Sequence, residues 1–173
     1  MRLASVVAQV LAPKGGSVVI GKDTRVSGYM FESAMEAGFV AAGTDVLLLG
    51  PIPTPAIAYL THSLGADAGV VISASHNPYY DNGIKFFGRD GCKLSDDMEV
   101  KIEKLLLETL VTRKSEQLGR ARRVDNALDQ YQWFCLGTVA TNVRFSKLKI
   151  VIDGAHGAGY KVAPRVLAEL GAD

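Results

Sequence analysis

Residues 73–78 form a short polar segment whose side chains could carry out nucleophilic chemistry. The segment reads Ser-Ala-Ser-His-Asn-Pro, and Lys85 follows it a few residues later. A serine hydroxyl beside hydrogen-bond donors and a lysine can attack an electrophile or accept a phosphoryl group. Ser75 is the candidate nucleophile, with His76 and Asn77 beside it, although an ordinary polar turn would have the same composition.

Two nucleophile chemistries compete for Ser75. A serine hydrolase built on an α/β sheet usually carries its serine in a G-x-S-x-G turn, and neither glycine flanks Ser75. Phosphoryl transfer requires positive charge, precise positioning and usually magnesium. Lys22 and Arg25 of the segment Gly-Lys-Asp-Thr-Arg could clamp phosphate oxygens, or Arg25 could simply pair with Asp23 in an exposed turn. The residues favour phosphoryl transfer over hydrolysis.

The apolar pattern predicts an α/β fold that brings these polar segments together. Buried strands are expected at 17–21, 45–49 and 68–72, with helices at 3–11, 27–42 and 54–64. Near-continuous apolar strands that alternate with helices are typical of a mostly parallel sheet sandwiched between helices. Because ligands bind outside the carboxyl ends of such strands, the segments 21–25, 50–55 and 73–78 should converge at one edge. The proline-rich segment 50–55 is expected to be a rigid scaffold.

The rest of the chain predicts further elements and a boundary. An antiparallel strand at 84–87, a helix beginning after Ser95 and a helix over 124–135 are expected, followed by a polar linker. Arg120, Arg122 and Arg123 are interpreted as a solvated loop rather than a phosphate patch. A strand over 148–153 and a helix over 162–170 then form one βα unit, which is expected to open a second domain. The order of Gly154, Gly157 and Gly159 favours a tight turn over a dinucleotide site.

The composition excludes several classes of partner. The 173 residues include 19 basic and 18 acidic side chains, with a net charge of +1, so no broad positive field favours nucleic acid or a membrane surface. Residues 2–12 imitate a short secretory signal, but their apolar spacing favours an amphipathic helix. Cys92 and Cys135 are too few for a disulfide framework, which favours a reducing, cytoplasmic compartment.

Three long motifs resemble those of the α-D-phosphohexomutase family. The first is residues 73–87, reading Ser-Ala-Ser-His-Asn-Pro-Tyr-Tyr-Asp-Asn-Gly-Ile-Lys-Phe-Phe. The second is residues 21–30, and the third is Pro53-Thr54-Pro55. The similarity extends over nearly the whole chain and is greatest to members that act on hexosamine phosphates.

The resemblance implies a role for each candidate residue. Ser75 would carry the phosphoryl group, and its phosphate would also be one ligand of a Mg²⁺ ion. His76 and Lys85 would serve in proton transfer or charge stabilisation, whereas Lys22, Arg25 and Asn77 would bind substrate or phosphate. Glucosamine 6-phosphate and glucosamine 1-phosphate would interconvert through a bisphosphate intermediate.

The chain also departs from the family pattern. Family members have four domains, begin with a strand that is missing here, and carry magnesium-binding aspartates in a D-x-D pattern that this sequence lacks. We therefore expect a fragment: residues 1–143 as most of the first domain, and residues 144–173 as the start of a second. Such a fragment should be inactive alone and prone to self-association. The alternatives are a non-catalytic sugar-phosphate-binding module, an enzyme for glucose or mannose phosphates and, third, the hydrolase.

Overall fold

Five strands form one mixed sheet in the computed structural model, which describes residues 1–108, 110 and 112–173. The strand order is β4-β3-β1-β2-β5. The strands are β1 (Ser17–Lys22), β2 (Asp45–Pro51), β3 (Ala68–Ile72), β4 (Ile84–Gly88) and β5 (Ala121–Arg123). All neighbours pair in parallel except β4, which is antiparallel to β3. The predicted mostly parallel sheet, with its antiparallel strand, is confirmed.

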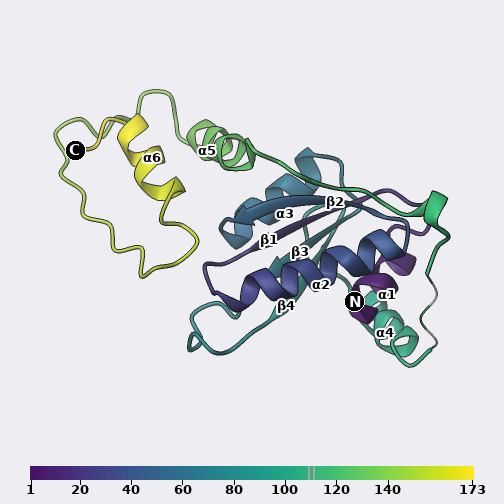
Figure 1. Ribbon diagram of the computed structural model, residues 1–173. Helices are drawn as coiled ribbons and strands as arrows, with labels where there is room; N and C mark the ends of the chain where they lie inside the picture. Colours follow the sequence, from purple (N-terminus) through teal and green to yellow (C-terminus); the bar gives the residue numbers. More distant parts are fainter. Residues whose placement is uncertain (109, 111) are drawn as a thin grey trace.

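Helices cover both faces of this sheet (Figure 1). The helices are α1 (Arg2–Leu11), α2 (Ser27–Ala41), α3 (Thr54–Ser63), α4 (Asp96–Leu105), α5 (Ala127–Gly137) and α6 (Val162–Glu169). Helices α1, α2 and α4 pack on one face, and α3 and α5 pack on the other. The α/β class and the helices expected from the sequence are thereby confirmed.

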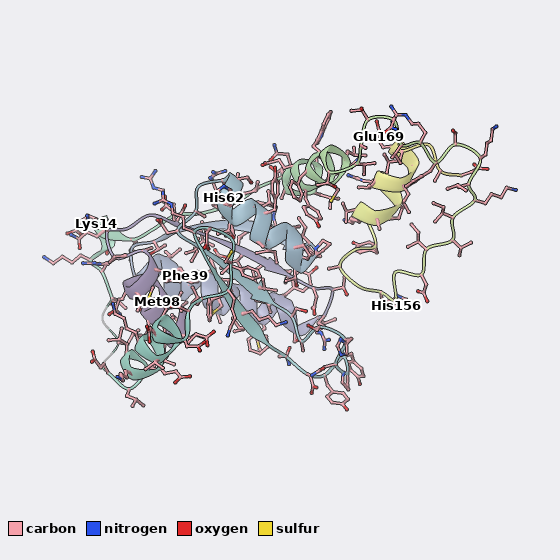
Figure 2. The ribbon with its side chains drawn as sticks, turned by 180° about the vertical axis from the view of Figure 1, so that it is seen from behind. Lys14, Phe39, His62, Met98, His156 and Glu169 are labelled. Carbon is pink, nitrogen blue, oxygen red and sulfur yellow. The ribbon has the colours of Figure 1, made fainter. Side chains whose placement is uncertain are left out.

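The two apolar layers explain why the strands are apolar without interruption. In β1, Val18 and Ile20 face the layer of α1 and α2, whereas Val19 faces the layer of α3. Successive side chains of a strand point to opposite faces, so both sets must be apolar when helices cover both. Phe39 of α2 is completely buried against the sheet (Figure 2).

Helix α1 is part of this core. It packs on α2 at Gly38, where an added Cβ would lie 2.5 Å from the main-chain oxygen of Met1 and 2.7 Å from Ala4 Cβ. Ala4 and Val7 are completely buried. The amphipathic helix predicted for the first residues is confirmed, and no helix in the described part of the chain is long and apolar enough to cross a membrane.

One prediction about local structure was wrong in detail. Helix α2 begins at Ser27 as predicted, and the Ser27 hydroxyl donates to Asn82 Oδ1 at 2.5 Å. The arginine-rich loop contains β5, which pairs with residues 46–48 of β2. All three residues of β5 are exposed, so the strand forms through main-chain hydrogen bonds that leave no apolar signal in the sequence.

The strand predicted over residues 148–153 does not form. Asp173 donates its N–H to Leu148 O at 2.9 Å, and Ile150 donates to Asp173 O at 2.9 Å, which is the pattern of one parallel bridge. Val151 is 97% exposed, because no strand among the described residues lies along it. Helix α6 forms as predicted and contacts α5 through Arg165 and Asp129, 3.1 Å apart, at one end of the molecule (Figure 1). The domain boundary near residue 143 stays a prediction.

Candidate active site

The loops that follow β1, β2 and β3 meet at the carboxyl edge of the sheet and line one cleft of about 1000 Å³. Residues 23–27, 52–55 and 73–82 each contribute side chains to its walls. The convergence predicted from the parallel strands is confirmed. Tyr79 and Tyr80 at the rim are 85% and 68% exposed, with their rings edge to face.

A further wall comes from residues 155–159, in the loop that precedes α6. Thr24 Oγ1 donates a hydrogen bond to the main-chain oxygen of His156, which connects this loop to the one after β1. Figure 2 labels His156 in this loop. Ala155 and His156 both have positive φ, 43° and 55°. The glycine turn was predicted, but its place in the cleft was not. The glycine turn follows an apolar segment, as the other loops of the cleft do, and this position in the sequence could have indicated that the turn lines the cleft.

Ser75 is exposed at the cleft and held in an unusual backbone conformation. Its φ is 55°, in the left-handed region that non-glycine residues rarely adopt. Its N–H donates to Ser73 Oγ at 3.0 Å, and its hydroxyl accepts a hydrogen bond from Lys85 Nζ at 3.1 Å. Lys85 lies on β4 directly opposite Val71 of β3, so the sheet itself fixes the lysine next to the serine loop. The contribution of Ser73 was missed by the sequence analysis.

His76 and Asn77 are exposed and line the same cleft. The Asn77 amide donates to Asp81 Oδ2 at 3.4 Å, which closes the loop on itself. The structure therefore brings together Ser75, His76, Asn77 and Lys85, as expected. An exposed hydroxyl with an ammonium group at hydrogen-bond distance can exchange a phosphoryl group with a bound substrate.

Arg25 lies at the cleft, but its guanidinium is occupied by protein groups. Its Nε donates to Asp23 Oδ2 at 2.9 Å, and the four remaining N–H groups donate to main-chain oxygens of the serine loop. These oxygens belong to Ser75, Asn77, Pro78 and Asp81. The local pair with Asp23, which was the alternative interpretation of this segment, is present.

Lys22 does not reach the cleft. It is 1% exposed, forms a buried salt bridge with Glu32 of α2, and places its Nζ 3.5 Å from the centre of the Tyr29 ring. Glu32 Oε1 has no hydrogen-bond partner among the described residues. The structure thus places the two predicted phosphate-binding cations in contact with protein groups instead.

The described residues do not form a metal site by themselves. Among them, no group of three or more His, Cys, Asp or Glu side chains is placed to hold a metal ion. The phosphate of a modified Ser75 would supply oxygen ligands, which Mg²⁺ prefers, but the carboxylates that usually accompany it are not gathered here.

The fold is an α/β/α domain whose cleft exposes the hydroxyl of Ser75 beside Lys85. Residues 1–111 match the family model described as phosphoglucomutase/phosphomannomutase, alpha/beta/alpha domain I. The chain belongs to this family.

Relatives and solved structures extend the similarity to the whole chain. Phosphoglucosamine mutase of Thioalkalivibrio sulfidiphilus is 57% identical over 174 residues, covering 100% of this chain and 39% of the relative. Phosphoglucosamine mutase of Pseudomonas syringae pv. syringae is 61% identical over 155 residues, covering 90% of this chain and 35% of the relative. The crystal structure of a phosphoglucomutase/phosphomannomutase family protein from Burkholderia thailandensis aligns with a TM-score of 0.79 and 27% identity, covering 99% of this chain and 38% of that one. The chain thus spans about two fifths of the length of these relatives.

Proposed function

We propose that this chain is the serine-bearing part of a phosphoglucosamine mutase, in which Ser75 carries the phosphoryl group that is exchanged with the sugar. The observation that carries the proposal is the hydrogen bond from Lys85 Nζ to Ser75 Oγ, 3.1 Å long, at the mouth of the cleft. A hydroxyl in that position is open to a substrate on one side and faces a cation on the other.

The geometry supports a phosphoryl transfer in which Ser75 Oγ is first the leaving group. A hydroxyl oxygen of a hexosamine phosphate attacks the phosphorus, the bond from phosphorus to Ser75 Oγ breaks, and the sugar becomes a bisphosphate. Lys85 is placed to stabilise the negative charge that develops on Oγ. The proton of the attacking hydroxyl passes to a base, for which His76 at the cleft wall is the candidate. Transfer of the other phosphate back to Ser75 restores the protein and releases the isomerised monophosphate.

The names of the relatives support glucosamine phosphates as the substrates. The two relatives that are 57% and 61% identical are both named phosphoglucosamine mutase, whereas the family protein with the glucose and mannose name is 27% identical. We therefore propose interconversion of glucosamine 6-phosphate and glucosamine 1-phosphate. Asn77 is the candidate for contact with the substrate, because it lines the cleft beside Ser75.

The resemblance to the family also implies Mg²⁺. The phosphate of Ser75 would be one ligand, and because the described residues gather no set of carboxylates, the other ligands would come from groups outside this chain. The chain alone is therefore expected to show no mutase turnover.

A chimera tests the proposal. The 173 residues replace the matching segment of the Thioalkalivibrio relative, and formation of glucosamine 1-phosphate is measured with Mg²⁺ and a sugar bisphosphate. We expect turnover by the chimera and none by the chain alone or by the Ser75→Ala chimera. Turnover by the Ser75→Ala chimera at the unsubstituted rate would contradict the role of Ser75. A preference for glucose or mannose phosphate would contradict the substrate.

A further inference from the structure

The guanidinium of Arg25 has no N–H group left for a substrate. An arginine has five such donors in a planar fork. One donates to Asp23 Oδ2 at 2.9 Å, and the other four donate to main-chain oxygens, with distances of 2.8 Å to Asp81, 3.0 Å to Ser75 and 2.9 Å to Asn77. The fourth oxygen is that of Pro78. The Arg25 side chain is only 12% exposed, so solvent and solutes have little access to it.

The segment held by Arg25 has few other restraints. Residues 75–81 contain no helix or strand, and their hydrogen bonds between main-chain groups are those from Asn77 to Ala74 at 3.1 Å and from Asp81 to Pro78 at 3.0 Å. Two further main-chain groups bond to side chains: the Ser75 N–H to Ser73 Oγ, and Tyr80 O to the Asn82 amide. The side chains of Tyr79 and Tyr80 point into solvent and bury little surface. Four carbonyl groups turned toward one cation fix the peptide planes between them, including the plane that follows Ser75.

Asp23 fixes the arginine in turn. Its carboxylate accepts hydrogen bonds from both the main-chain N–H of Arg25, at 3.0 Å, and Arg25 Nε, at 2.9 Å. Its own N–H donates to Ile72 O at 3.0 Å, so the residue is attached to the ends of both β1 and β3. A continuous set of hydrogen bonds therefore runs from the sheet through Asp23 and Arg25 to the serine loop.

The geometry points to Asp23 and Arg25 as positioning residues that do not bind the phosphate themselves. They hold the loop so that the Ser75 backbone stays in its left-handed conformation and Ser75 Oγ stays within reach of Lys85. This inference rests on the proposed function of Ser75 as the phosphoryl carrier. Because Asp23 neutralises Arg25, Lys85 is the cation without an acidic partner that faces the serine hydroxyl within the described part of the chain. A substrate phosphate must then find its donors elsewhere in the cleft.

Hydrogen exchange of the 173-residue chain tests the positioning directly. Arg25→Lys keeps the charge but loses the fork, and Asp23→Ala removes both carboxylate contacts. We expect the amides of Asn77 and Asp81 to exchange at least about tenfold faster in both variants. The amides of Val70 to Ile72 should be unchanged, which shows that the sheet is intact. Arg89→Lys is the control, because Arg89 is 73% exposed and contacts Asp67 only at 3.9 Å.

Kinetics of the chimera separate positioning from phosphate binding. Loss of positioning should lower kcat at least about tenfold in Arg25→Lys with little change in KM, whereas loss of a phosphate ligand should raise KM. Unchanged exchange of the loop in both variants, or a raised KM with kcat retained, would overturn the inference. Exchange is measured on the unphosphorylated chain, so it would still increase if Ser75 proved not to carry phosphate. Failure of the proposed function would therefore be recognised separately.

Discussion

Lys85 Nζ lies 3.1 Å from Ser75 Oγ, although the two residues belong to different elements of the structure. Ser75 is in the loop after β3, and Lys85 is on β4, paired through its main chain with Val71. Because β4 runs antiparallel to β3, Lys85 lies beside the end of β3, where the serine loop begins. This arrangement lets one sheet position both the serine hydroxyl and the lysine that donates a hydrogen bond to it.

Replacement of Lys85 should slow phosphoryl transfer without disturbing the fold. In the chimera, Lys85→Met keeps the length of the side chain but removes the ammonium group, and kcat should fall about 100-fold or more. Lys93→Met is the matched control, since Lys93 is an exposed lysine whose contacts are surface ion pairs with Asp96 and Glu99. A Lys85→Met chimera that keeps more than about half of its kcat would show that Lys85 does not stabilise the transferring group.

The buried pair of Lys22 and Glu32 should be essential to stability as a pair. The two side chains are 1% and 7% exposed, so Lys22→Met leaves a carboxylate in the core without a partner. We expect the free energy of unfolding to fall by about 3–5 kcal/mol, measured by urea denaturation followed by circular dichroism. The double variant Lys22→Met with Glu32→Leu should recover most of the loss. A single variant as stable as the unsubstituted chain would rule out this account of the pair.

The contact between α1 and α2 should not tolerate a side chain at position 38. Gly38→Ala places a methyl group within 3 Å of Met1 and Ala4, and overpacking of this kind costs about 1–3 kcal/mol. Gly137→Ala in α5 is the control, for which the free energy of unfolding should rise instead of fall, because nothing lies within 4 Å of its added Cβ. There we expect a gain of about 0.5–1 kcal/mol from helix propensity. Thermal unfolding of both variants measures the difference, and equal changes would contradict the close approach of α1.

Stability at alkaline pH should depend on Tyr131. Burial, followed by the hydrogen bond with the Cys135 side chain and its charge, raises the pKa of the Tyr131 phenol to about 12 from its usual 10.0. The folded state therefore holds this proton more tightly than the unfolded state, so stability declines as pH rises from about 10 to about 12. Tyr131→Phe should flatten that part of the pH profile of the urea midpoint. An identical profile in the variant would show that Tyr131 does not contribute.

The sheet could be predicted from the sequence because its strands are buried. All five residues of β3 are buried, and their apolar run gave its bounds without error. The order of loops followed from the parallel topology, which places every carboxyl end at one edge. In contrast, β5 forms although all its residues are exposed, and residues 148–153 form only the single bridge to Asp173 although they are mostly apolar. Burial of side chains therefore did not indicate whether these two segments pair as strands.

The partners of the two cations could not be predicted from residue types alone. Lys22 follows Val18 and Ile20 at intervals of two, which places it on the face of β1 that packs against α2, where Glu32 lies. This alternation could be recognised in the sequence. Which carboxylate pairs with Lys22 could not, because it depends on how α2 packs against the sheet. The carbonyl groups around Arg25 have no side-chain signature at all, since main-chain oxygens are common to every residue.

Phosphopeptide mass spectrometry of the chimera, after incubation with glucosamine 1,6-bisphosphate and Mg²⁺, tests the central claim most directly. We predict one phosphate ester on Ser75, absent from the neighbouring Ser73 and absent from the Ser75→Ala variant. A chimera that turns over substrate but carries its phosphate on another residue, or on none, would contradict the assignment of Ser75 as the phosphoryl carrier.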